Sequence, residues 1–375
     1  MVFKFSNDIT LDEARKKNRS IKKGVSFDNK IVFINGFGAS GKTMLSPIIS
    51  SMDRVESPVF PYEIQWISSF LYSSKMDEEL YSEFIRQYCD NTIYNLTMGR
   101  NSNFRFSDIS SIFQSPKRFK FLKRIFEKGD NASVDEIKVK KPIINFTSSA
   151  LLLFINEIAK SLSNRVLFIE TFRDPLYMFK QAKINHKEVH VEKREKNFTF
   201  EVFEENERSF YFDYYSNIDQ FRNLDLSKSN EQIVKYLERV YQFYFNFDFN
   251  KIDMNGGKLI CLPFEKFVLG PDKWIDEILS FLDIEKTKNL IKELKKQKVP
   301  RKILTDGYSR SVYKRYSQYP VKKKYANFSD ADNDYKEQIK LEFGKNEITF
   351  FNQLLDLSNK YRDWSKKFEN KISWN

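Results

Sequence analysis

The stretch from Lys30 to Met52 constrains the fold of this chain more than any other, because it joins three kinds of local structure in one run. Ile31 to Ile34 form an apolar run typical of a short buried strand, and Asn35 to Gly41 indicate a glycine-containing loop. From Thr43 onward the pattern predicts a helix, because apolar residues recur at helical spacing at Leu45, Ile48, Ile49 and Met52.

The loop satisfies the pattern G-x-x-x-x-G-K-S/T, with strand and helix predicted on its two sides. The whole chain has 11 glycines, and three of them lie within residues 36–41, which indicates a loop with a specific backbone path. Its N–H groups should point inward, and the following helix adds roughly half a positive charge, so an anionic group can be held there. The predicted phosphate-binding residues are Gly36, Gly38, Ala39, Ser40, Gly41, Lys42 and Thr43.

Three more apolar runs predict buried strands, at residues 142–146, 165–172 and 258–262. An amphipathic helix is expected at 148–161, and strand–helix–strand spacing of this kind favours parallel pairing through a right-handed crossover. Ligands of parallel sheets bind beyond the carboxyl ends of the strands. We therefore expect Gly36–Thr43 and Arg173–Pro175 to face the same crevice.

Composition indicates a globular chain with a sizeable core, because 41% of the 375 residues are hydrophobic and 16% are aromatic. We predict a single domain over residues 1–375, with helical insertions at about 64–140 and 185–255. Cys89 and Cys261 stand alone and the chain has two histidines, so we expect no metal cluster and no disulfide framework.

The net charge of +12 predicts an electrostatic field that attracts anions, such as a nucleotide, an acidic glycan, nucleic acid or anionic lipid. The sequence contains no recognisable nucleic-acid reader motif, so no specific nucleic-acid partner is expected. The amino terminus is charged from the start, and the longest apolar run, Ala150–Ile155, is far shorter than a membrane span. We therefore expect a cytoplasmic protein without a transmembrane segment.

Three segments together resemble the sulfotransferase family. The loop GASGKT is similar to the family's 5'-phosphosulfate loop, although Lys42 is a departure toward a nucleoside triphosphate loop. The segment RVLFIETFRDPLYMFKQ looks like the family's strand and R-D-P turn at the 3'-phosphate site. The segment KLICLPFEKFVLGPDKWIDEILSFLDI is similar to the family's later strand, turn and helix. The resemblance spans residues 31–284.

This resemblance implies a three-layer P-loop-type α/β fold with a central, mostly parallel sheet. It also implies transfer of a sulfuryl group from 3'-phosphoadenosine-5'-phosphosulfate (PAPS) to a hydroxyl acceptor, with a carbohydrate expected. Arg173 would bind the 3'-phosphate, together with Gln181, which stands where the family usually has serine. The family's basic carboxyl-terminal segment is represented loosely by Arg301, Lys302, Gly307 and Arg310.

In-line sulfuryl transfer develops negative charge on the leaving phosphate oxygen, so Lys42 and the loop N–H groups are expected to stabilise the transition state. The acceptor hydroxyl must also lose a proton to a base. Glu63 is the expected base because family members supply a carboxylate at a similar distance after the first helix. Glu56 is the second candidate, and His186 or His190 is a weaker one.

Two other interpretations stay open. An ATP- or GTP-dependent kinase or NTPase would use Lys42 and Thr43 with magnesium, and Glu170 could supply its metal-binding carboxylate. A binding protein could keep the loop without catalysis, and it would bind nucleotide without turnover.

Overall fold

The computed structural model describes residues 20–24, 26–106, 108, 110–149, 151–188, 201–204, 207–211, 229–304, 325 and 327–375. Its centre is a six-stranded sheet in the order β2-β3-β1-β4-β7-β8. The strands are β1 (Ile31–Asn35), β2 (Val55–Val59), β3 (Ile143–Thr147), β4 (Val166–Phe172), β7 (Lys258–Pro263) and β8 (Ser373–Trp374). All pairs are parallel except β7 with β8, so the predicted α/β class with a mostly parallel sheet is confirmed.

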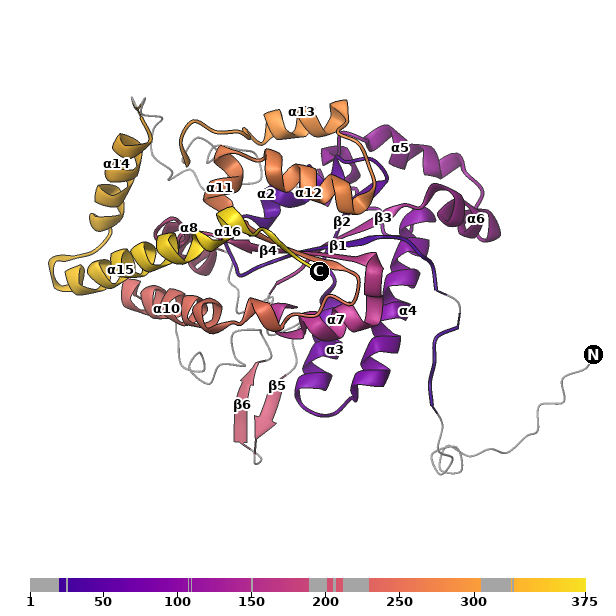
Figure 1. Ribbon diagram of the computed structural model, residues 1–375, viewed down its shortest axis with the longest axis horizontal. Helices are drawn as coiled ribbons and strands as arrows, with labels where there is room; N and C mark the ends of the chain where they lie inside the picture. Colours follow the sequence, from indigo (N-terminus) through magenta and orange to yellow (C-terminus); the bar gives the residue numbers. More distant parts are fainter. Residues whose placement is uncertain are drawn as a thin grey trace, which may run out of the picture.

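Helices cover both faces of this sheet (Figure 1). On one face lie α2 (Lys42–Ser50) and α12 (Asp272–Leu282), and on the other lie α4 (Glu78–Thr97) and α7 (Ile155–Leu162). The remaining helices are α3 (Tyr62–Tyr72), α5 (Arg118–Lys123), α6 (Asn131–Lys140), α8 (Pro175–Glu188), α10 (Asn230–Asn246), α11 (Phe264–Leu269), α13 (Lys288–Lys296), α14 (Phe328–Lys340), α15 (Ile348–Ser365) and α16 (Lys367–Asn370).

Residues 64–140 hold most of α3 together with α4, α5 and α6, whereas residues 185–255 hold α10 and an antiparallel hairpin. The hairpin consists of β5 (Glu201–Glu204) and β6 (Glu207–Tyr211). The organisation as one domain with two helical insertions stays a prediction.

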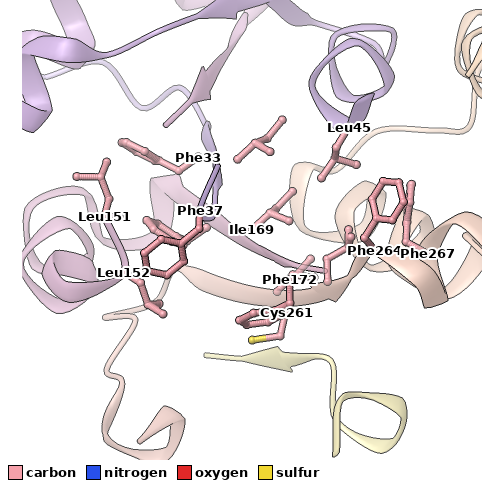
Figure 2. Close-up of a cluster of buried hydrophobic side chains, with 14 of the residues drawn as sticks. Phe33, Phe37, Leu45, Leu151, Leu152, Ile169, Phe172, Cys261, Phe264 and Phe267 are labelled. Atoms are coloured by element: carbon pink, nitrogen blue, oxygen red, sulfur yellow. The ribbon is translucent and has the colours of Figure 1, made fainter. Parts of the chain in front are cut away.

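The core forms around β1, whose five residues are all buried. Phe33 on β1 packs against Phe146 on β3 and Phe168 on β4, with ring centroids 5.0 and 5.9 Å away. In Figure 2, apolar side chains from α2, α11 and the central strands gather in one cluster beside the carboxyl ends of the strands. The loop that leaves β1 is therefore built on a fully buried, closely packed strand.

Two strands differ from the sequence predictions. β2 was not among the predicted strands. It contains Pro58, and it is an edge strand, where a residue without an N–H donor is tolerated. β8 is only two residues long and pairs with the other side of the sheet, a contact that no local pattern indicates.

Candidate functional site

The loop after β1 depends on two glycines in the left-handed region of backbone space. Gly36 has φ +139° and Gly41 has φ +109°. A Cβ atom on Gly36 would lie 2.3 Å from Thr171 Oγ1, and one on Gly41 would lie 2.3 Å from the Phe264 ring. Both positions therefore require glycine for conformation and for space. Helix α2 then begins at Lys42, with Gly41 as its N-cap.

A chain of hydroxyl groups attaches the loop to the end of β4. The Thr171 hydroxyl donates to the Asn35 carbonyl at 2.7 Å, and the Ser40 hydroxyl lies 2.6 Å from Thr171 Oγ1. Because the Ser40 side chain is buried in this contact, any contribution of Ser40 to anion binding would come from its backbone N–H, which here donates to the Phe37 carbonyl at 3.3 Å.

Lys42 lies across the inside of the loop. Its ammonium donates to the carbonyl oxygens of Gly36 and Phe37, the latter at 2.9 Å. Burial lowers the pKa of Lys42 to about 8, although the nearby Glu170 carboxylate raises it. A phosphate oxygen could therefore replace weakly basic carbonyls as the partner of this ammonium group.

Glu170, on β4, is fully buried beneath the loop. Its carboxylate accepts hydrogen bonds from the Asn35 side-chain amide and from the Tyr244 hydroxyl, both at 2.6 Å. Burial raises the pKa of Glu170 to about 7, against the opposing effects of these hydrogen bonds and Lys42. Both carboxylate oxygens are thus engaged with protein.

Arg173 reaches the loop, as its place after β4 predicted. Its Nη1 donates to the Ala39 carbonyl at 3.0 Å, and its guanidinium lies 4.5 Å from the centroid of the Phe264 ring. Arg301 contacts the same ring at 5.4 Å, and its Nη2 lies 3.3 Å from the Met44 sulfur in the first turn of α2. Two guanidinium groups therefore meet at the side of the phosphate-type loop.

The turn after Arg173 begins α8. Asp174 accepts a hydrogen bond from the Leu176 N–H at 2.9 Å, and Pro175 occupies the first helical position, where its missing N–H carries no cost. Asp174 also accepts from Ser358 and Arg362, both at 2.7 Å. These two residues were not among the predicted site residues.

The Asp174 N–H donates to the Glu265 carboxylate at 2.9 Å, and this carboxylate also accepts from the Tyr361 hydroxyl at 3.0 Å. Burial, reinforced by the neighbouring Asp174, raises the pKa of Glu265 to about 7. The turn that carries Arg173 is thus fixed from α11 and from α15.

The two carboxylates proposed as bases lie in different surroundings. Glu63 is exposed in the first turn of α3, where its Oε2 accepts from the Tyr88 hydroxyl at 2.8 Å. Because α3 follows the carboxyl end of β2, Glu63 lies at the same edge of the sheet as the loop. The sheet order places β3 between β2 and β1, so Glu63 approaches from two strands away.

Glu56 is fully buried on β2 and pairs with both terminal nitrogens of Arg124, at 2.7 and 2.9 Å. Burial alone would raise its pKa, but Arg124 and the nearby Lys120 and Lys117 hold the pKa of Glu56 below its usual value. This ion pair attaches the segment around Arg124 to β2. Of the two carboxylates, Glu63 is the one that a substrate could reach.

The other predicted residues that the structure describes lie on α8 and in the segment that follows Pro300. Gln181 is buried on α8, and Lys302 is exposed two residues after the cis bond between Val299 and Pro300. His186 belongs to α8, but its side chain lies outside the described residues, as do His190, Gly307 and Arg310.

A cleft of about 480 Å³ lies at the amino edge of the sheet, opposite the loop. It is lined by Asp53, Arg54, Asp283, Ile284, Glu285 and Thr287. Arg54 donates to the carbonyls of Leu282 and Asp283, at 3.1 and 2.9 Å, at the end of α12. The carboxylates of Asp53, Asp283 and Glu285 in the cleft disfavour an anionic ligand, so this cleft is not the candidate site.

Among the described residues, no group of three acidic, histidine or cysteine side chains is placed to hold a metal ion. No helix in this part of the chain has the length and apolar character needed to cross a membrane.

No protein-family model matches the chain, and no match is found among curated proteins. The fold is similar to the sulfotransferase domain of the olefin synthase from Synechococcus PCC 7002, at 11% identity and a TM-score of 0.35 over 92% of this chain and 98% of that one. It is also similar to the sulfotransferase domain from the curacin biosynthetic pathway, at 11% identity and a TM-score of 0.33 over 71% of this chain and 77% of that one.

A third similar structure is the sulfotransferase STF1 from Mycobacterium tuberculosis H37Rv, at 10% identity and a TM-score of 0.29 over 78% of this chain and 77% of that one. At these levels of similarity, only the geometry of the site bears on the activity of this chain.

Proposed function

We propose that this protein is a sulfotransferase that moves a sulfuryl group from PAPS to a hydroxyl acceptor. The contact between Arg173 and the loop carries the proposal, because Nη1 lies 3.0 Å from the Ala39 carbonyl. A guanidinium beside a phosphate loop suits a donor with two separated anionic groups. The loop would take the 5'-phosphosulfate, and Arg173 with Arg301 would take the 3'-phosphate.

The residues present fit such a donor. Gly36 and Gly41 let the loop pack directly against Thr171 and Phe264, and the amino end of α2 contributes positive potential to the loop. Lys42, Arg173 and Arg301 supply the charges that a nucleotide with phosphates at both ends requires.

The state of Glu170 weighs against the kinase or NTPase alternative. Such enzymes hold magnesium with a carboxylate that follows a buried strand, and Glu170 is the residue at that position here. Both of its oxygens accept hydrogen bonds from protein groups at 2.6 Å, and the side chain is fully buried. Presenting this carboxylate to a metal ion would break a buried polar network, which is costly. Sulfuryl transfer, which needs no metal ion bound by Glu170, is therefore favoured over the kinase or NTPase reaction.

PAPS, when bound, supplies an activated sulfuryl group and a phosphate leaving group. Lys42 would exchange its bonds to the Gly36 and Phe37 carbonyls for bonds to donor oxygens, where negative charge develops. The N–H groups from Ser40 to Thr43 would act at the same place, once the Ser40 N–H gives up its 3.3 Å bond to the Phe37 carbonyl. Arg173 would orient the donor by holding its far end, which is a positioning contribution.

Glu63 is the proposed base that accepts the proton of the acceptor hydroxyl. It is exposed at the carboxyl edge of the sheet, and the Tyr88 hydroxyl fixes one of its oxygens while leaving the other for the acceptor. The acceptor that we propose to test first is a carbohydrate hydroxyl.

The test is transfer of labelled sulfate from PAPS to a panel of carbohydrate alcohols. Glu63→Gln should lower turnover by roughly 10²- to 10⁴-fold, because the amide cannot accept the proton. Glu79→Gln is the matched control, since Glu79 is an exposed carboxylate on the first turn of α4. Equal turnover in wild type and Glu63→Gln would remove Glu63 from the catalytic residues. Failure of the wild-type protein to transfer label to any alcohol would count against the reaction itself.

A further inference from the structure

A second surface of the molecule exposes large apolar side chains in an unusual concentration. Phe104, Phe106, Phe119, Ile125 and Phe126 all lie between residues 104 and 126, and we call these five residues the α5 surface. Their exposed fractions run from 53% for Phe104 to 87% for Phe126. They make up a third of the fifteen exposed large hydrophobic residues in the described part of the chain. Exposed apolar side chains that gather in this way mark an interaction site.

The α5 surface is held in place by side chains that point the other way. Lys117 donates to the Met52 carbonyl at 2.8 Å and to the Val55 carbonyl, and Arg124 pairs with Glu56. Phe121, between them, is buried. The segment is thus docked on edge strand β2, near α6 in Figure 1. The inward contacts of Lys117 and Arg124 fix the position of its outward side chains.

The parts of this surface are also connected to one another. The Phe106 ring stacks on Phe113 with centroids 4.4 Å apart, and Phe104 lies 6.1 Å from the same ring. Phe113 belongs to the short helix η1 (Ile112–Gln114), which packs against α5. The exposed phenylalanines before and after η1 therefore belong to one continuous region.

The charge around the apolar side chains is strongly positive. Residues 99–128 contain eight Lys or Arg and two Asp or Glu. Lys117 and Arg124 are used internally, but Arg105, Arg118, Lys123 and Lys128 are exposed among the phenylalanines. Cations interleaved with large apolar side chains are typical of surfaces that bind an anionic lipid bilayer.

Other partners fit this surface less well. A second copy of the chain, bound symmetrically, would place the same cations opposite one another, which is unfavourable. Nucleic acid would neutralise the cations and stack on the phenylalanines, but it would leave Ile125, which is 66% exposed, without an apolar partner. Acyl chains accept aliphatic and aromatic side chains alike.

We propose that the α5 surface binds the interface of an anionic membrane, with Phe119, Ile125 and Phe126 inserted below the headgroups and Arg118 and Lys123 on the lipid phosphates. This binding is peripheral and does not depend on the sulfotransferase proposal.

Co-sedimentation of the full chain with lipid vesicles tests the proposal. Vesicles of phosphatidylcholine with about 30% phosphatidylglycerol should bind the protein, and pure phosphatidylcholine should bind it much less. Phe119→Ser with Phe126→Ser should weaken binding by roughly ten-fold or more. Arg118→Gln with Lys123→Gln should weaken it by about five-fold for each cation, and added salt should do the same.

Leu341→Ser is the matched control, because Leu341 is 84% exposed but lies at the end of α14, outside the α5 surface. All of these positions are exposed, so circular dichroism should show folded variants. Three results would overturn the proposal. They are no binding to the anionic vesicles, equal binding by the phenylalanine variant and the control, or tighter binding to single-stranded DNA than to vesicles, lost in the same variant.

Discussion

Glu170 lies opposite Asn35 in the parallel pairing of β4 with β1, and the Asn35 amide donates to the Glu170 carboxylate at 2.6 Å. The Asn35 oxygen in turn accepts from the Ser148 hydroxyl and the Leu151 N–H, both at 3.0 Å. One buried polar junction therefore joins three strand ends immediately beneath the loop that begins at Gly36. The charge of Glu170 affects the stability of this junction.

Glu170→Gln is expected to flatten the dependence of stability on pH between about 4.5 and 7. Burial raises the folded-state pKa of Glu170 from 4.5 to about 7, so in this window the folded protein keeps a proton that the unfolded chain has lost. Each pH unit in the window then lowers the free energy of unfolding by about 1.4 kcal/mol, and below pH 4.5 this effect disappears. Urea unfolding at several pH values measures the slope.

Glu277→Gln serves as the control for this experiment. Pairing with Lys258 holds the pKa of Glu277 below its usual value, so its stabilising contribution is lost only at lower pH. Its removal should leave the slope between about pH 5 and 7 unchanged. Identical slopes for wild type and Glu170→Gln would show that Glu170 is not the group that titrates.

Anion binding should depend on the proton of Lys42. Because its pKa is lowered to about 8, the affinity for adenosine 3',5'-bisphosphate should fall as the pH rises above that value. Lys42→Arg keeps the positive charge at every pH and should remove this fall, whereas Lys42→Ala should weaken binding by roughly 10- to 100-fold at neutral pH.

Calorimetric titration measures each affinity. Lys292→Ala, an exposed change on α13, should bind like wild type. If the affinity of the wild type stays constant up to about pH 9.5, Lys42 does not contribute its charge to binding.

Gly41→Ala should destabilise the protein by more than about 1 kcal/mol, because of its positive φ and its contact with Phe264. Removing the Phe264 ring should relieve part of this cost. A double-mutant cycle with Phe264→Ala is therefore expected to give a smaller penalty for Gly41→Ala in the Phe264→Ala background. Gly270→Ala is the control, since nothing lies within 4 Å of a Cβ atom there. Additive costs of the two changes would mean that the ring does not limit residue 41.

Much of this fold follows from local pattern. The four predicted strands match β1, β3, β4 and β7 to within one residue at each end. The meeting of Arg173 with the loop also followed from sequence, because parallel strands place their carboxyl ends at one edge. Both β1 and β4 begin with four consecutive apolar residues, Ile31–Ile34 and Val166–Ile169, which makes them easy to predict.

Other features of the site depend on contacts between distant residues. Ser358 and Arg362 support Asp174 across more than 180 positions of sequence, and on an amphipathic helix such residues have the pattern of a solvated face. The burial of Glu56 could not be predicted either, because the Arg124 that neutralises it lies 68 residues away. Neither relationship leaves a signal in residue spacing.

Arg173→Gln should separate a ligand contact from a structural one. If Arg173 binds the 3'-phosphate, the variant should lose roughly 10- to 100-fold in affinity for adenosine 3',5'-bisphosphate and little for 5'-AMP. The bond to the Ala39 carbonyl gives Arg173 a structural role as well, and its loss alone would weaken both nucleotides alike. Titration of the variant with both nucleotides distinguishes the cases. Equal losses would contradict the assignment of Arg173 to the 3'-phosphate.

Thermal unfolding with two ligands tests the sulfotransferase assignment most directly. Adenosine 3',5'-bisphosphate in the presence of EDTA is compared with ATP plus magnesium, on the full chain. At about 100 times its dissociation constant, a ligand of the folded state adds roughly 2.7 kcal/mol of stability. The account predicts this stabilisation by the bisphosphate without any metal. Stabilisation by ATP with magnesium and none by the bisphosphate would contradict it.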